Sequence, residues 1–407
     1  MRAASLFLLA AALSMLIPIQ IPAAAQSPSG IAVPIVCRSY YFFEIVKVVN
    51  GSPVVKKLQV DVPVNVSLGN IEQRSYVVMS SGVSKGWIVN VSRPGLSYVV
   101  ALVRVCYPNT TWMIHLVRAF LEIPNLYKNY SVPTKILREY VGKPEPVILN
   151  VSSAFVAWLR NSSIPFWDLS IGGLAYRAAL FIYWIYIKYS PSAIPHSVEQ
   201  TVRTRRGDCD DMSRVLTELL WYYDIPALML YGYVLLNLSK PFAGSLGGVT
   251  FVMPDTGPHA FVVAYIPPFG WLSLDLLAGS YIVYPFIIVE VTNNTRVSKE
   301  EVREFIELCS TMRGTEIAFA LPSSAIERVS EETGIPTLEV LRMLVRFASS
   351  YRSPENLSIG VIRSYLNRLA ALFLNTVYRL VMLFGEPYPG FIAVARWRCG
   401  AEVHLPT

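Results

Sequence analysis

Three residues in the middle of the chain, Cys209, His259 and Asp275, have the types and the order that nucleophilic thiol chemistry requires. In such a site a thiolate attacks a carbonyl carbon, a histidine takes and returns the proton, and a carboxylate holds the imidazole in the correct tautomer. Taken singly, each residue would more often be structural, because a lone cysteine at a helix start is usually a small buried apolar residue. The three together predict a site for acyl transfer.

The segment from Arg205 to Asp211 places Cys209 at the predicted start of a helix. Gly207 permits a sharp turn and Asp208 can cap the helix. Apolar residues then recur at spacings of three and four as far as Tyr223, which indicates one buried helical face. The free N–H groups at this helix end favour a thiolate and can also receive an oxyanion.

Two aspartates that follow the cysteine, Asp210 and Asp211, suit a helix start but oppose thiolate formation electrostatically. A cationic partner for the cysteine is therefore needed, and His259 is the natural candidate among four histidines. We expect Arg205 or Arg206 to neutralise the aspartates. A role for Arg203, Arg205 and Arg206 in binding an acidic substrate is the less favoured alternative.

His259 and Asp275 lie on two predicted strands joined by a tight turn at residues 267–270. His259 is expected to open its strand directly after a flexible turn at residues 255–258, so that its ring can reach a neighbouring helix end. If the hairpin turns around Pro268 and Phe269, His259 and Asp275 fall close to opposite each other. The carboxylate can then accept the imidazole N–H.

The elements around these residues predict an α+β core in which the cysteine helix packs on an antiparallel sheet. A long apolar helix over Ile171–Tyr189 precedes the cysteine helix. It is short for a membrane span and carries Arg177 near its middle, so we interpret it as a core helix. The predicted strands that follow are Ala227–Leu238, His259–Ile266, Trp271–Leu276 and Tyr281–Val291.

The segment from Thr204 to Leu276 resembles the core of the transglutaminase-like superfamily, whose members have a papain-like fold. The likeness rests on the residues around Cys209, on residues 223–227 and 231–233, on His259-Ala260-Phe261, and on residues 266–275. In that family the matching cysteine, histidine and aspartate form a catalytic triad, so the resemblance assigns these roles to Cys209, His259 and Asp275. The family commonly has Trp where this chain has Phe261, and often Pro where it has Leu276.

The resemblance implies an exported enzyme that transfers acyl groups through a thioester. We expect hydrolysis of peptide or protein amides, because water is the commonest acceptor. A transamidase that cross-links proteins is the alternative within the same chemistry. A surface binding or assembly module that retains the fold without catalysis is the alternative of another class. The side-chain oxyanion donor that some members use is not assigned by the sequence.

The rest of the chain divides into further predicted units. Residues 30–125 contain short runs rich in Val, Ile, Tyr and Phe between turn signals, which predicts a β-sandwich-like domain. Residues 126–165 form a connecting arm, the catalytic core spans 166–297, and residues 298–407 are predicted helical. The stretch 326–344 imitates a DNA-reading helix-turn-helix, but we interpret it as an ordinary helical hairpin.

Composition and the N-terminus point to export. The chain has 407 residues, of which 53% are hydrophobic and 15% charged. Residues 1–25 resemble a signal peptide that ends at a small-residue cleavage site. An uncleaved segment would instead anchor the protein to a membrane. Nine Asn-x-Ser/Thr triplets are consistent with a secreted or cell-surface glycoprotein.

The five cysteines leave one thiol unpaired in an oxidising compartment. From their positions we expect Cys37 to pair with Cys106 and Cys309 with Cys399, which leaves Cys209 free. The four dispersed histidines and the aspartates around Cys209 lack the spacing of zinc or calcium sites, so no metal and no cofactor is expected. The net charge of +7 is spread along the chain, so no nucleic-acid partner is expected.

Overall fold

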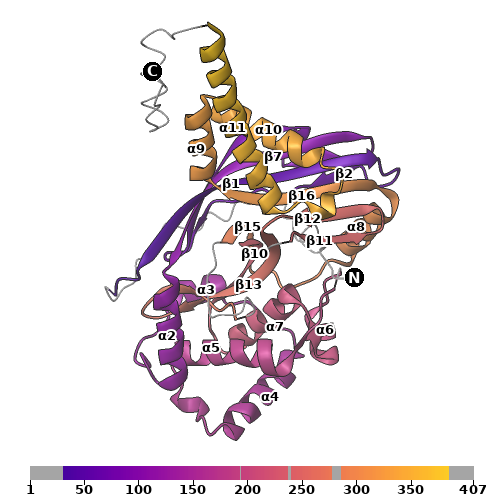
Figure 1. Ribbon diagram of the computed structural model, residues 1–407. Coiled ribbons are helices and arrows are strands. Elements are labelled where there is room, and N and C mark those ends of the chain that lie inside the picture. Colours follow the sequence, from indigo (N-terminus) through magenta and orange to yellow (C-terminus); the bar gives the residue numbers. More distant parts are fainter. Residues whose placement is uncertain (1–30, 193, 237–239, 277–285, 385–407) are drawn as a thin grey trace.

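A computed structural model describes residues 31–192, 194–236, 240–276 and 286–384 (Figure 1). The predicted signal peptide lies outside these residues. Among the described residues, no helix combines the length and the apolarity that crossing a membrane would require.

A seven-stranded sheet with the order β11-β12-β16-β1-β7-β4-β3 forms one half of the molecule. Its strands are β1 (Ile35–Asn50), β3 (Val66–Ser67), β4 (Glu72–Ser81), β7 (Gly95–Pro108), β11 (Phe242–Leu246), β12 (Val249–Met253) and β16 (Arg313–Pro322). The sequence predicted that residues 30–125 form a β unit of their own. Instead, their strands share this sheet with a hairpin from the core region and with one strand from the C-terminal region.

Strand β16 lies in the stretch that the sequence predicted to be helical. Six consecutive residues of this strand, Glu316–Leu321, are buried. A strand that is covered on both faces shows no polar–apolar alternation, and this explains why its sequence pattern did not reveal it. One face of the sheet carries α9 (Ser323–Thr333), α10 (Thr337–Ser349) and α11 (Ile359–Phe384), as Figure 1 shows.

The segment that imitates a DNA-reading motif is a helical hairpin, as predicted. Helices α9 and α10 bury Ile326, Val340 and Leu341 against strands of the sheet. The apolar face of α10 is therefore occupied by the protein core.

A four-stranded sheet with the order β14-β13-β10-β15 forms the centre of the other half. Its strands are β10 (Ala227–Leu235), β13 (Thr256–Ile266), β14 (Gly270–Ser273) and β15 (Phe286–Thr292). These match the four strands expected from the sequence in place and order, but β13 begins three residues earlier than predicted and β14 ends at Ser273. Residues 237–238 and 281–285 of the predicted strands lie outside the described residues. Short strands β2 (Lys57–Gln59), β5 (Val83–Ser84), β6 (Ile88–Asn90), β8 (Lys188–Tyr189) and β9 (Arg206–Gly207) form two small sheets.

Helices cover the four-stranded sheet on the side away from the seven-stranded one (Figure 1). They are α2 (Thr110–Glu122), α4 (Ile148–Asn161), α5 (Ile171–Leu180), α6 (Val198–Thr204) and α7 (Cys209–Tyr222). Helix α3 (Thr134–Tyr140) packs on the opposite face, against Leu228 and Val263. A π-helix, η2 (Phe181–Tyr186), continues α5, and α8 (Lys299–Thr311) lies beside the larger sheet. The short helices η1 (Phe166–Asp168) and η3 (Pro354–Asn356) complete the fold. The expected α+β core, with the cysteine helix on an antiparallel sheet, is confirmed.

The predicted connecting arm is in fact part of the core. Helix α4 buries Ile148, Val151, Phe155 and Leu159 in the same apolar cluster as the cysteine helix α7. The prolines that suggested an extended arm lie between helices, at positions 133, 144, 146 and 165. Residues 126–165 therefore contribute a helix, α4, that packs in the same core as the cysteine helix.

One of the two disulfides expected from the sequence is present in the described residues. Cys37 and Cys106 lie directly opposite each other on β1 and β7 and form a disulfide. Cys309 is buried beside Leu308 and Met312 in the apolar cluster under the seven-stranded sheet. Its expected partner, Cys399, lies outside the described residues, so this pair stays a prediction. Cys209 is a free thiol, as predicted.

Candidate active site

The N-terminus of α7 is held by a capping box between Asp208 and Asp211. Asp211 Oδ2 accepts the Asp208 backbone N–H at 3.4 Å. Gly207 precedes this cap, and a Cβ added there would lie only 2.6 Å from Cβ of Asp211. The sharp entry predicted at this glycine therefore depends on the absence of a side chain.

Cys209 is the first residue of α7 and its side chain is half-buried. It packs against Met229, Tyr231 and Ala260 on the neighbouring strands. Burial, together with Asp208 and Asp210, raises the pKa of the Cys209 thiol well above its usual value, whereas the backbone N–H of Ala260 lowers it. The thiol thus lies against the peptide unit that follows His259.

His259 and Asp275 form a buried hydrogen-bonded pair, with 2.8 Å between Nε2 of the ring and Oδ2 of the carboxylate. His259 lies inside β13, where it pairs with Gly232, so it does not open the strand as predicted. The tight turn in front of β13 contains Asp255, which has a left-handed backbone (φ 54°). When Nε2–H donates to Asp275, Nδ1 of His259 is left as a proton acceptor.

Aromatic side chains fix the orientation of the His259 ring. Phe261 stacks on it at 6.0 Å between centroids, and Phe286 meets it edge-on at 6.3 Å. The sequence identified Phe261 as a departure from the family pattern. In the structure this residue still supports the histidine.

A hydroxyl network joins the cysteine helix to the histidine strand. Ser213 Oγ lies 2.6 Å from the carbonyl oxygen of Cys209 and 3.3 Å from that of Ala260. It also lies 3.2 Å from the hydroxyl of Tyr183, which is buried on η2. Tyr183 interacts electrostatically with both Asp275 and Cys209. Sequence reasoning missed both residues, although Ser213 lies one helical turn after the cysteine.

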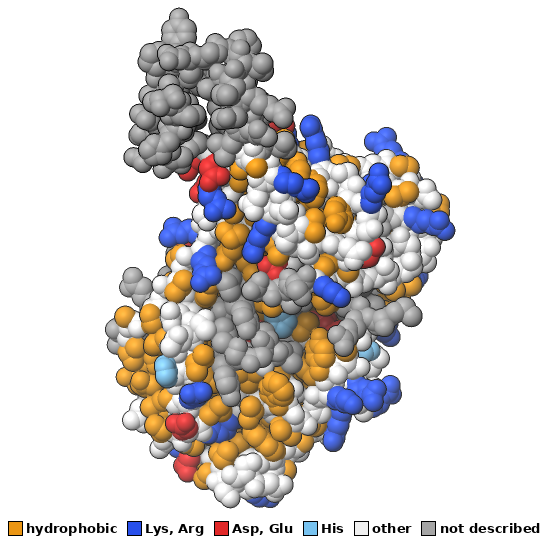
Figure 2. All heavy atoms as spheres, in the orientation of Figure 1, with side chains coloured by type: hydrophobic (Ala, Val, Ile, Leu, Met, Phe, Trp, Pro, Cys, Tyr) orange, Lys and Arg blue, Asp and Glu red, His pale blue; other side chains and the backbone are white. Residues whose placement is uncertain are grey.

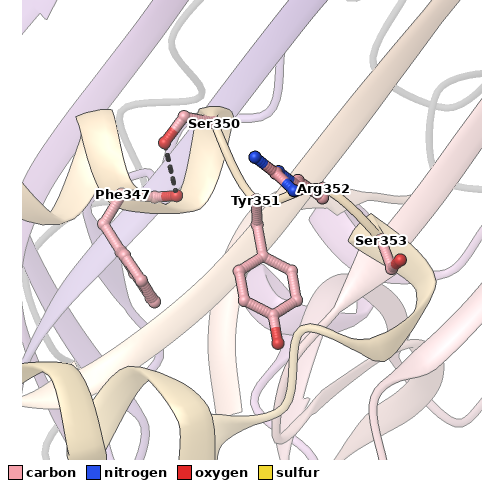
Figure 3. A pocket seen from close by; sticks show the side chains of 5 residues that line it. All are labelled: Phe347, Ser350, Tyr351, Arg352 and Ser353. Carbon is pink, nitrogen blue, oxygen red and sulfur yellow. Dashed lines mark hydrogen bonds between the residues drawn. The ribbon is translucent and has the colours of Figure 1, made fainter.

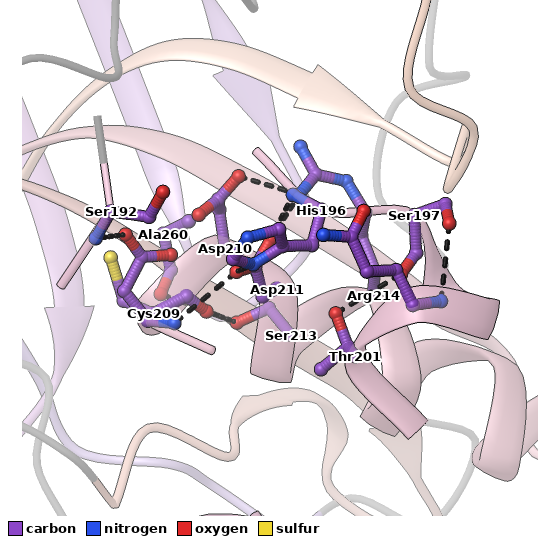
Figure 4. A network of polar contacts seen from close by, with 12 residues as sticks. Ser192, His196, Ser197, Thr201, Cys209, Asp210, Asp211, Ser213, Arg214 and Ala260 are labelled. Atoms are coloured by element: carbon purple, nitrogen blue, oxygen red, sulfur yellow. Dashed lines mark hydrogen bonds and ion pairs between the residues drawn. The ribbon is translucent and has the colours of Figure 1, made fainter. Parts of the chain in front are cut away.

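The partner of the two aspartates on α7 is Arg214, from the same helix (Figure 4). Its Nη1 forms ion pairs with Asp210 and, at 3.3 Å, with Asp211, and its Nη2 donates to the hydroxyl of Tyr231. The expectation that Arg205 or Arg206 would neutralise the aspartates is wrong. Arg205 lies over the ring of Tyr186 instead. Spacings of three and four residues on the helix could have identified Arg214.

His196 is the second partner of Asp211. Its backbone N–H donates to Oδ1 at 2.7 Å, and its ring Nδ1 lies 2.8 Å from Oδ2 (Figure 4). The segment before α6 is therefore tied to the start of the cysteine helix.

Tyr189 follows η2 and lies beside the entry to α7. It pairs with Gly207 in a short parallel ladder, and Ser190 N–H donates to the Gly207 carbonyl at 2.8 Å. Its phenol interacts electrostatically with Cys209, Asp208 and Asp210. The residue is 51% exposed, so its phenol is accessible from solvent.

Three ligand atoms at this helix end lie within 4.8 Å of one another: Sγ of Cys209 and one carboxylate oxygen each from Asp208 and Asp210. Thiolate and carboxylate can bind a divalent cation, but Asp210 is ion-paired with Arg214 and Asp208 accepts the backbone N–H of Ser192, so we do not assign these residues as metal ligands. The group was not identified from spacing.

A depression on the described surface lies outside this site. A shallow depression after α10 is lined by Phe347, Ser350, Tyr351, Arg352 and Ser353, and Ser350 Oγ donates to the Phe347 carbonyl inside it (Figure 3). Arg352 is its one charged group. Lysine and arginine side chains are distributed over the upper and lower parts of the face in Figure 2 and do not gather in one patch.

A comparison with protein families agrees with the resemblance in the sequence. Residues 173–276 match the family model described as the transglutaminase-like superfamily. No curated protein matches the chain. Similar solved structures include a candidate cysteine protease from Cytophaga hutchinsonii, with 14% identity, a TM-score of 0.35, and coverage of 64% of this chain and 84% of that one. Another is the periplasmic domain of TgpA from Pseudomonas aeruginosa bound to ethylmercury, with 12% identity, a TM-score of 0.28, and coverage of 60% and 90%.

Proposed function

Because residues 173–276 form a transglutaminase-like core, we propose that the protein is a thiol acyl-transfer enzyme that hydrolyses peptide or protein amides. Cys209 is the nucleophile, His259 the general base and acid, and Asp275 the residue that orients the imidazole. The observation that carries the proposal is the buried His259–Asp275 hydrogen bond beside a half-buried thiol at a helix N-terminus.

The environment of the thiol determines how the first step runs. Burial and neighbouring carboxyls raise the pKa of Cys209, so the resting enzyme holds a thiol at neutral pH. His259 Nδ1 therefore removes the proton as the sulfur attacks the amide carbonyl. The sulfur–carbon bond forms, the carbonyl electrons move to the oxygen, and the imidazolium is stabilised by Asp275.

The tetrahedral intermediate then collapses. The amine leaves with the proton from His259, and the acyl group remains on Cys209 as a thioester. Water attacks this thioester while His259 takes its proton, and the carboxylic acid and the free thiol are released. The backbone N–H of Cys209 is placed at the helix end to receive the oxyanion, and we assign the phenol of Tyr189 as a second donor.

The Cys37–Cys106 disulfide supports an extracytoplasmic location, because such bonds persist in oxidising compartments. We propose export on this basis and on that of the predicted signal peptide. Peptides or proteins outside the cytoplasm are then the substrate class.

The test uses a thiol-reactive probe, a peptide library and mass spectrometry on the purified protein. We expect iodoacetamide to label Cys209 faster than the buried Cys309, and to label it more slowly in His259→Ala. We also expect cleavage of library peptides that is lost in Cys209→Ala. An unreactive Cys209 and an uncleaved library would contradict the enzyme and favour a binding module. Incorporation of a fluorescent amine into acceptor proteins, in place of cleavage, would identify a transamidase.

A further inference from the structure

The start of α7 carries more carboxyl groups than its one guanidinium can neutralise. Asp208, Asp210 and Asp211 are 5%, 5% and 0% exposed, and Arg214 forms ion pairs with the last two. Asp208 receives the backbone N–H of Ser192 on Oδ2, at 3.2 Å. Asp208 therefore has no cationic partner among the described residues.

Two buried oxygens at this point lack a donor. Oδ1 of Asp208 and Oδ1 of Asp210 accept no hydrogen bond from any residue in the described part of the chain. One carboxylate oxygen of each residue lies within 4.8 Å of the other and of Cys209 Sγ. Two ionised carboxylates at this separation would repel each other, and both oxygens would remain unsatisfied.

A single proton between the two carboxyls removes both problems. The proton belongs on Asp208, because Asp210 is held in its ionised form by Arg214. We propose that Asp208 is a neutral carboxylic acid that donates a hydrogen bond to Asp210 and thereby keeps a negative charge away from Cys209. Asp208 is then a positioning residue for the proposed acyl transfer, whereas its protonation does not depend on that function.

The charges around the pair agree with this assignment. Burial and the neighbouring Asp210 raise the pKa of Asp208 to about 10, while Arg214 overcomes the effect of burial and lowers the pKa of Asp210. The groups that face the pair are Cys209, Asp211 and Arg214 on α7, Tyr189 on β8, Tyr231 on β10, and Ser192 and His196 from the segment before α6. Arg214 and His196 are the cationic candidates among these groups, and neither pairs with Asp208.

The consequence concerns the thiolate. With Asp208 neutral, the strongest remaining carboxylate effect on Cys209 is that of Asp210, which Arg214 compensates. The site therefore keeps the geometry of an acidic helix cap without the full electrostatic cost to the nucleophile.

The direct test is infrared spectroscopy of the full-length protein with ¹³C-labelled aspartate carboxyls, recorded at pH 8.5. This pH lies above the pKa values of about 7 for Asp61 and about 6 for Asp211. We expect a labelled carbonyl stretch of a protonated carboxylic acid in the wild type and its loss in Asp208→Asn. Absence of the band in the wild type would overturn the proposal, and this measurement needs no variant to fold.

The second readout is the rate at which iodoacetamide alkylates Cys209 as a function of pH. Asparagine keeps the donor and the neutral charge, so Asp208→Asn should stay within about twofold of wild type, whereas Asp208→Leu removes the donor and should shift the profile. Asp168→Asn, an exposed site remote from Cys209 in the sequence, is the control. If Asp208 were ionised, its replacement by asparagine would accelerate alkylation at neutral pH by about tenfold or more.

A bound cation is the competing explanation and is tested on the same samples. Elemental analysis that finds a stoichiometric divalent metal, with the infrared band appearing only after chelation, would overturn the proposal. Failure of the proposed function gives a different result, namely an intact band with no peptide cleavage by the wild type.

Discussion

The hydrogen bond between His259 and Asp275 joins residues that are not directly opposite each other in the hairpin. Val263 pairs with Ser273, so the same register continued would place Phe261 opposite Asp275, with His259 two residues further along. Asp275 lies two residues beyond the end of β14, and its Oδ2 lies 2.8 Å from Nε2 of His259. The pair therefore depends on the chain after β14 as well as on the strands.

Replacement of Asp275 by asparagine tests this relationship. The amide can donate to Nε2 and so favour the tautomer in which Nδ1 is protonated and cannot accept the thiol proton. We expect peptide cleavage to fall by a factor on the order of 10²–10⁴, with a smaller change in KM. Asp168→Asn, on the exposed helix η1, should leave cleavage unchanged. Retention of wild-type cleavage by Asp275→Asn would remove the orienting role.

Tyr189→Phe separates oxyanion stabilisation from nucleophile activation. Loss of the phenol should lower kcat for amide cleavage by about 10²-fold, because a donor aimed at developing charge is removed. Alkylation of Cys209 by iodoacetamide forms no oxyanion, so its rate should change little. Tyr76→Phe on β4, where the side chain is 72% exposed, is the matched control. An equal loss in cleavage and in alkylation would instead indicate that Tyr189 acts on the thiol.

A buried acidic cluster predicts how stability depends on pH. Glu44, Asp61 and Glu316 are at most 4% exposed, and Tyr233 donates to Asp61 Oδ2 at 2.7 Å. Burial first, and then neighbouring carboxyls, raise the pKa of Glu44 well above normal and that of Glu316 to about 8. Burial likewise raises the pKa of Asp61 to about 7, against the opposing effect of Tyr233.

The folded state therefore keeps protons that the unfolded chain releases above about pH 4. The stabilisation is complete below that pH and is lost as the pH rises through 7 to 8. We expect the free energy of unfolding, measured with urea, to fall by several kcal/mol between pH 5 and pH 9. Glu316→Gln should flatten this dependence, and the exposed Glu355→Gln should not. A stability that rises over the same range would refute the prediction.

Removal of the Cys37–Cys106 disulfide should lower the free energy of unfolding without changing the structure around Cys209. The bond joins residues 69 positions apart, and cross-links of this kind contribute about 2–4 kcal/mol by restricting the unfolded chain. The double variant Cys37→Ser/Cys106→Ser should show this loss in urea unfolding and become insensitive to reductant. Cys209 should still be alkylated in the folded variant. A wild type that unfolds at the same urea concentration with and without reductant would contradict the bond's contribution.

Much of the site was predictable because its signals are local. The glycine before the cap, the cysteine at the helix start and the turn before Trp271 are each encoded within a few residues, and the structure has the predicted helix and strands around them. The ion-pair partner of the aspartates was assigned wrongly, to Arg205 or Arg206. Arg205 and Arg206 precede the turn before α7, whereas Arg214 lies on the same face of the helix as the two aspartates, one turn further along.

Longer-range features left no such signal. Strand β16 pairs with β1, and the paired residues are more than 260 positions apart in the sequence. Because β16 is buried on both faces, its sequence has no alternation of polar and apolar residues from which a strand could be predicted. The position of Cys309 also depends on packing, because α8 buries this residue in the apolar cluster that it forms with the sheet.

The sequence alone determined the order of the chemical groups and the elements that carry Cys209, His259 and Asp275, because capping, periodicity and turn chemistry act over a few residues. Only the tertiary structure decided which groups meet. It joined strands from three parts of the chain into one sheet and buried Asp208 beside Asp210. It also brought Ser213 into contact with Tyr183 and with the backbone of Cys209. Burial and proximity shift pKa values and select ion pairs, and both are properties of the packed fold.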